Sequence, residues 1–189
     1  GSRVCLIEAD LRRPRLLEYL GMEGAAGLTD VLIERADIND VLQPYGQDRL
    51  EVIGAGAIPP NPSELLASDA MSRVLTHLST RFDYVLIDTP PALPVTDAVV
   101  LSTKVDGVIV LVGTTIVRKD QLRATFEALA SAENGLADGA GFGVSVQEAP
   151  GAAAAVPVVQ PSGPVREAIA IAVTSIFFEC NVMGTLSRR

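Results

Sequence analysis

VCLIEADLRRPR, which spans Val4 to Arg15, is the stretch that decides the fold of this chain. Four apolar residues lead directly into Glu8, Asp10 follows two positions later, and arginines then surround a proline. A short apolar run that does not alternate with polar residues is typical of a strand buried on both faces of a parallel sheet. We therefore expect a buried strand that delivers two carboxylates at its carboxyl end.

Three more runs of this kind follow, and helical patterns separate them. The runs are LEVI at Leu50–Ile53, YVLI at Tyr84–Ile87 and GVIVLV at Gly107–Val112. Strands that alternate with helices in one sheet require right-handed crossovers. The predicted fold class is therefore α/β, a doubly wound and mostly parallel sheet with helices on both faces.

The clearest helical pattern is NPSELLASDAMSRVLTHLSTRF, which begins at Asn61. Asn61 is expected to cap this helix, with Pro62 in the first helical position. An apolar stripe then recurs every four residues, at Leu66, Ala70, Val74 and Leu78. We also expect a helix in RKDQLRATFEALASA, and two shorter helices in GLTDVLIERADINDVL that break near Asp37.

Composition narrows the function classes. The chain has 189 residues, of which 48% are hydrophobic and 20% charged, so it can fill a core and is not disordered overall. A formal net charge of -8 argues against a general nucleic-acid binder, which needs a basic face. Cys5 and Cys180 lie too far apart to suggest a disulfide framework or a zinc site. A reduced, cytosolic setting is the interpretation that fits best.

Acidic residues stand where two predicted strands end. Glu8 and Asp10 follow the first strand, and Asp88 follows the apolar residues of YVLIDTPP. Ligands of doubly wound sheets bind at the carboxyl ends of the strands. The YVLID pattern has the form of a Walker B strand, whose aspartate helps to hold Mg²⁺ on a nucleotide. The alternative, that Asp88 only caps the turn into Pro90, stays open at this point.

The regular alternation stops after Glu133, which divides the chain into three parts. Residues 1–133 form the predicted domain. Residues 134–165 are rich in Gly, Ala and Pro and are predicted to be a loop or linker. Residues 166–189 form a short apolar segment of unknown role, which the pattern allows to be either a helix or a strand.

Several motifs together resemble a known family. CLIEADLRRPR and VLIDTPP are similar to the Walker A′ and Walker B motifs of the bacterial protein-tyrosine kinases that control capsule and exopolysaccharide synthesis. GAGAIPPNPSELLAS and TDAVVLSTKVDGVIVLV also resemble this family, in the same order along the chain. The resemblance covers about Arg3 to Glu133. It implies a P-loop NTPase-like fold and ATP-dependent phosphoryl transfer to protein tyrosines, with ATP and Mg²⁺ as cofactors.

The resemblance also assigns roles to residues. Asp10 and Asp88 would hold Mg²⁺, directly or through water. Glu8 stands where the family has an aspartate that orients or deprotonates the incoming tyrosine hydroxyl, and glutamate moves that charge by one methylene. Arg12 completes the motif, and its guanidinium suits contact with phosphate or with an acidic group.

The resemblance further implies partners and a location. The expected partners are a transmembrane chain-length-determinant or activator protein, or a fused membrane domain, together with protein tyrosine substrates. A homo-oligomer is expected in the complete protein, at the cytoplasmic face of the plasma membrane, and no nucleic acid is involved.

One expected motif is missing from the sequence. These kinases carry a P-loop, G-x-x-x-x-G-K-[ST], before Walker A′, but neither Lys104 nor Lys119 lies in such a loop. We therefore expect an N-terminally truncated fragment that is inactive by itself. Two alternatives stay open: an ATPase of the partition or division-site type, and a degenerate docking domain without catalysis.

Overall fold

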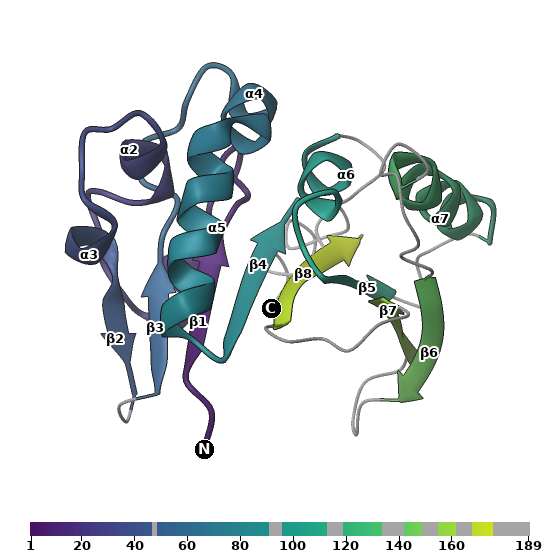
Figure 1. Ribbon diagram of the computed structural model, residues 1–189. Coiled ribbons are helices and arrows are strands. Elements are labelled where there is room, and N and C mark those ends of the chain that lie inside the picture. Colours follow the sequence, from purple (N-terminus) through teal and green to yellow (C-terminus); the bar gives the residue numbers. More distant parts are fainter. Residues whose placement is uncertain are drawn as a thin grey trace, which may run out of the picture.

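The structure, a computed structural model, describes residues 1–46, 49–90, 96–112, 119–133, 142–148, 155–161 and 168–175. One eight-stranded sheet runs through these residues in the order β2-β3-β1-β4-β8-β5-β7-β6 (Figure 1). Its strands are β1 (Val4–Glu8), β2 (Gln43–Tyr45), β3 (Leu50–Ile53), β4 (Tyr84–Thr89), β5 (Gly107–Val112), β6 (Phe142–Glu148), β7 (Ala155–Pro161) and β8 (Ala168–Ser175).

The five central strands, from β3 to β5, are parallel to one another. β2 at one end, and β7 and β6 at the other, run antiparallel to their neighbours. The predicted mostly parallel α/β sheet is confirmed, and each of the four strands expected from apolar runs is present. The sequence did not predict β2, which is only three residues long.

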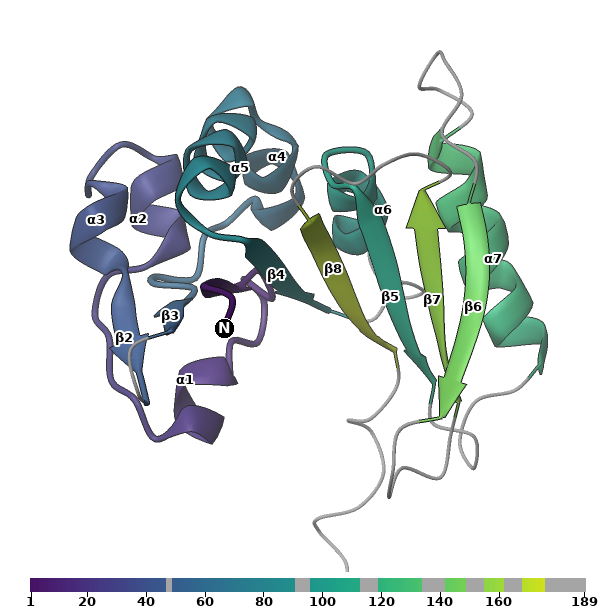
Figure 2. The same cartoon turned by 60° about the horizontal axis from the view of Figure 1, so that its bottom comes forward.

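The helices are α1 (Leu16–Leu20), α2 (Leu28–Leu32), α3 (Ile38–Val41), α4 (Pro62–Ala67), α5 (Asp69–Arg81), α6 (Asp97–Ser102) and α7 (Lys119–Glu133). Figure 2 shows α1 on the opposite side of β1, β3 and β4 from α5. The expected break near Asp37 is confirmed, because the Asp37 side chain caps α3 by accepting a bond of 2.8 Å from the Asn39 N–H.

The long helix predicted from Asn61 is in fact two helices, and its expected cap is wrong. Ser68 has extended backbone angles that separate α4 from α5, and its hydroxyl accepts from the Met71 N–H and so caps α5. The Asn61 side chain makes no capping bond; its amide instead donates to the Glu64 carboxylate at 2.6 Å. Pro62 does occupy the start of α4, as predicted.

The predicted apolar stripe faces the core. Leu66, Val74 and Leu78 are buried, and Ala70 packs against the same cluster. That cluster also holds Ile7 and other buried residues of the central strands, which explains why those strands carry no polar alternation. Packing in this core thus holds in place the central strands whose carboxyl ends carry the predicted acidic residues.

Two strands lie inside the range that composition predicted to be a loop or linker. β6 and β7 pair with each other over seven residues, so the prediction of an irregular 134–165 is wrong for these parts. The β-branched valines, such as Val144 and Val146 in β6, outweigh the Gly and Ala content because they favour extended backbone. β8, which the pattern left open, is a strand between β4 and β5.

Candidate functional site

Glu8 and Asp88 lie side by side at one edge of the sheet. They are register partners on the adjacent parallel strands β1 and β4. The next residue, Ala9, donates its backbone N–H to the Asp88 carbonyl at 2.7 Å. Two acidic strand ends therefore meet, as the sequence predicted, at the edge where ligands of doubly wound sheets bind.

The Glu8 side chain turns inward and contacts backbone N–H groups. It is buried, with 2% of its surface exposed. Its Oε1 accepts from the N–H of Arg15 and, at 2.5 Å, from that of Leu16, while its Oε2 accepts from the Ala55 N–H at 3.1 Å. Hydrogen bonds from three donors offset the cost of burying this carboxylate.

Asp10 organises the loop that leaves β1. Its Oδ1 accepts from the N–H groups of Arg12 and Arg13, at 3.1 and 3.0 Å. Such a bond from a side chain to the backbone two residues further on is an Asx turn. The turn fixes the orientation of the Asp10 carboxylate, which is half-buried beside the end of β1.

Arg12 contacts an acidic group, one of the two kinds of partner expected for it. Its Nε donates to Asp97 Oδ2 at 2.7 Å, and its Nη2 donates to Asp97 Oδ1 at 3.1 Å and to Ser63 Oγ at 2.9 Å. The Ser63 hydroxyl donates in turn to Asp97 Oδ1 at 2.5 Å. The bond to Asp97 is the main reason that the pKa of Arg12 is raised.

Asp97 and Ser63 were missed by the sequence reasoning. Asp97 is the first residue of α6 and is completely buried, and Ser63 lies in the first turn of α4. Together with Arg12 they join the loop after β1 to the beginnings of two helices. An aspartate directly before the apolar residues AVVL is a helix-start signal that could have identified Asp97, but not its partner.

The carboxylates suit a magnesium ion that is bound together with phosphate. Mg²⁺ prefers oxygen ligands and usually binds one or two carboxylates plus substrate phosphates. Asp88 pairs in register with Glu8 at the end of β1, and Asp10 follows Glu8 by two residues, so both candidate ligands belong to this end of the sheet. Among the described residues, no three His, Cys, Asp or Glu side chains gather closely enough to hold a metal by themselves.

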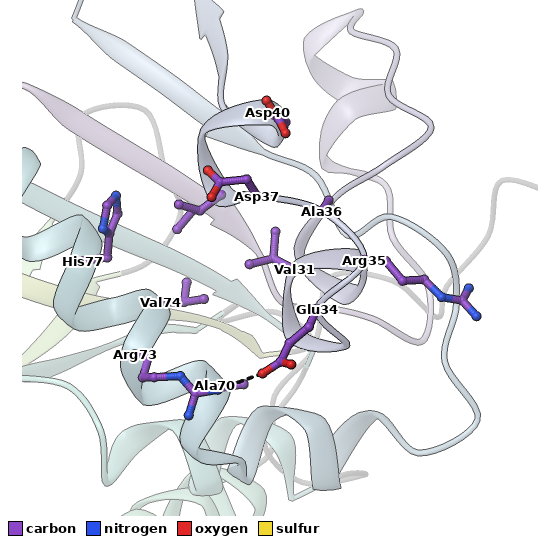
Figure 3. A pocket seen from close by; sticks show the side chains of 11 residues that line it. Val31, Glu34, Arg35, Ala36, Asp37, Asp40, Ala70, Arg73, Val74 and His77 are labelled. Carbon is purple, nitrogen blue, oxygen red and sulfur yellow. Dashed lines mark hydrogen bonds and ion pairs between the residues drawn. The ribbon is translucent and has the colours of Figure 1, made fainter.

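A separate groove lies between α2, α3 and α5 (Figure 3). It measures about 580 Å³, and Val31 and Val74 contribute to its apolar part. The ion pair between Arg73 and Glu34, at 3.3 Å, crosses one end, whereas Arg35 points away. None of the predicted site residues lines this groove, so it is not the site that the motifs indicate.

Comparisons with known proteins agree with the motif pattern. No family model matches the chain. It is 36% identical over 136 residues to the tyrosine-protein kinase YwqD of Bacillus subtilis, a match that covers 72% of this chain and 57% of YwqD. The chain therefore spans a little over half the length of that relative.

Solved structures give the same result. The VpsO kinase domain is 32% identical, with a TM-score of 0.65, over 69% of this chain and 64% of that domain. The kinase domain of the Escherichia coli tyrosine kinase ETK is 33% identical, with a TM-score of 0.64, over 69% of this chain and 51% of that domain. By sequence and by structure, this chain is a relative of the bacterial tyrosine-protein kinases.

Proposed function

We propose that the chain is part of an ATP-dependent protein-tyrosine kinase that regulates capsule or exopolysaccharide synthesis and export. The observation that carries this proposal is the meeting of Glu8 and Asp88 at one sheet edge, with Asp10 in the loop that follows. The named kinases among its relatives supply the reaction type.

In this proposal Asp10 and Asp88 hold Mg²⁺, directly or through water. When bound, Mg²⁺ on ATP neutralises the charge that develops on the phosphate oxygens during phosphoryl transfer. The Asx turn leaves Asp10 Oδ2 without a hydrogen-bond donor among the described residues, so that oxygen is available to a cation or to its water. Arg12 contributes indirectly, by holding the loop that carries Asp10, because its guanidinium is already bound to Asp97.

The family relationship also supports proposals about partners. We expect protein tyrosines as substrates, a homo-oligomer, and a membrane-bound activator or chain-length determinant that places the domain at the cytoplasmic face of the membrane. Within the part of the chain that the structure describes, no helix has the length and apolarity to cross a bilayer.

The test is transfer of radiolabel from [γ-³²P]ATP to tyrosine by the complete gene product that contains this chain. Asp88→Asn and Asp10→Asn each remove one charged metal ligand and should lower the rate by about a hundredfold or more at fixed Mg²⁺, since preorganised charge is a large catalytic term. Asp40→Asn, which neutralises an exposed carboxylate on α3, is the matched control and should leave the rate unchanged. An undiminished rate in Asp88→Asn would contradict the metal role.

A further inference from the structure

The Glu8 carboxylate closes a loop onto the end of the strand from which that loop starts. The chain leaves β1 at Glu8, passes through Asp10 and Arg12, and returns so that the Arg15 and Leu16 N–H groups meet Glu8 Oε1. We propose that Glu8 is a positioning residue for Asp10, and not the base that accepts a proton from tyrosine. The effect of this positioning on catalysis rests on the proposed kinase function, whereas the hydrogen bonds that Glu8 accepts do not.

Burial and hydrogen bonding argue against the base role. A general base must come within hydrogen-bond reach of the proton that it removes. Glu8 is 2% exposed, and each of its two oxygens already accepts from the backbone. A tyrosine hydroxyl would have to reach the one remaining acceptor site, on Oε2 of this buried side chain, or displace N–H groups that would then be left unpaired.

The same carboxylate holds a second loop. Oε2 binds the N–H of Ala55, directly after β3. The neighbouring carbonyls of Gly54 and Ala55 accept from the N–H groups of Leu28 and Thr29 at 2.7 and 2.9 Å, which anchors α2. Glu8 therefore links the loop that carries Asp10 to a segment after β3 that is itself hydrogen-bonded to the start of α2.

The length of the side chain matters for this role. The family places an aspartate here, and an aspartate is shorter by one methylene. From the same backbone position, an aspartate carboxylate would stop one methylene short of the N–H groups at the start of α1 and in the loop after β3 that Glu8 contacts. In this chain, Glu8→Asp should therefore release the loop, although it restores the residue type of the family motif.

The first experiment reads the bonds directly in the wild-type chain. Scalar couplings across hydrogen bonds should connect the Glu8 carboxylate carbon to the amide nitrogens of Arg15, Leu16 and Ala55. In Glu8→Gln and Glu8→Asp these three amides should exchange with solvent roughly ten- to a hundredfold faster, as expected for the loss of bonds to a charged acceptor. Missing couplings in the wild type, or unchanged exchange in a folded variant, would overturn the proposal.

The second experiment separates positioning from general stability. In the complete gene product, Glu8→Asp should raise the Mg²⁺ concentration needed for half-maximal tyrosine phosphorylation by about tenfold or more, because Asp10 is no longer fixed. The matched control is Glu51→Asp, which shortens a half-buried carboxylate bound to Arg81 at 3.0 Å in β3. That control should reduce stability without moving the Mg²⁺ requirement.

The base role predicts the opposite result for Glu8→Asp, because the family residue would be restored and activity retained at an unchanged Mg²⁺ requirement. That result would overturn the positioning role. If the complete protein phosphorylates no tyrosine under any condition, the proposed function fails, and the couplings and amide exchange decide the role of Glu8 independently.

Discussion

The Arg12–Asp97 pair should be asymmetric, so that losing the arginine costs more stability than losing the aspartate. The Asp97 side chain is completely buried, whereas 39% of the Arg12 side chain is exposed. Arg12→Met retains most of the aliphatic stem but leaves a buried carboxylate without its cation. Removing one partner of a buried pair costs about 3–5 kcal/mol. We expect about 3 kcal/mol here, since Ser63 still donates to Asp97.

Asp97→Ala leaves Arg12 without its acid, but a partly exposed guanidinium can turn toward water. The expected cost is therefore smaller, about 1.5–2 kcal/mol, at the low end of the range for hydrogen bonds to charged groups. The double variant should be more stable than Arg12→Met alone, because no buried charge then lacks a partner. If Arg12 and Asp97 are energetically coupled, the cost of the double variant will differ from the sum of the two single costs, whereas two independent surface contacts would give additive costs.

The assay is urea unfolding followed by circular dichroism, with free energies of unfolding compared among the three variants. The matched control is Arg73→Met, which applies the same substitution to an ion pair whose Arg and Glu side chains are 65% and 79% exposed. It should change stability by less than about 1 kcal/mol. A cost for Asp97→Ala equal to or above that for Arg12→Met, or simple additivity in the double variant, would refute the reasoning.

Three further predictions concern the scaffold. Ser68→Ala should cost about 1 kcal/mol of stability, because it removes the cap of α5. Asn61→Ala should change stability by less than about 0.5 kcal/mol, because the Asn61 side chain caps no helix. Equal denaturation midpoints for the two variants would show that the Ser68 cap is unimportant. Gly27→Ala should destabilise the domain by about 2 kcal/mol, because the added methyl group would lie 2.2 Å from the Gly54 carbonyl oxygen. An unchanged melting temperature in thermal unfolding would contradict this packing. Burial raises the pKa of the Cys5 thiol from 9.0 to about 12. Because the thiol of the unfolded chain ionises first, the free energy of unfolding should fall as pH rises from 9 toward 12. The Cys5→Ala variant should lose that pH dependence.

Much of the fold was predictable because strands that are buried on both faces have short, continuous apolar sequences. β1, β3, β4 and β5 are short apolar runs, and β5 matches its predicted range of Gly107–Val112. The break between α2 and α3 follows from Asp37, whose capping preference is local. The division of the long helix at Ser68 was missed because Ser68 sits in an unbroken apolar periodicity, and serine occurs both within helices and as a cap.

The place of the acids could be predicted, but the direction of their side chains could not. Parallel strands bring their carboxyl ends to one edge, which places Glu8 beside Asp88 from the pattern alone. Whether Glu8 faces a substrate or the protein depends on an N–H that lies 47 positions away, at Ala55. The partner of Arg12 is 85 positions away, and no local rule connects the two.

These long-range bonds change what the motif means in this chain. A motif of two acids and an arginine suggests three side chains that face one ligand. Here Glu8 and Arg12 both bind within the protein, one to backbone N–H groups and the other to Asp97, and Asp10 lies between them in the chain. Two anchors on either side of one residue restrict the rotamers and backbone angles that it can adopt, which lowers the entropy lost when it binds a cation. The motif is therefore best understood as one candidate metal ligand held by two structural neighbours, and a variant of either neighbour should act on the metal requirement through Asp10.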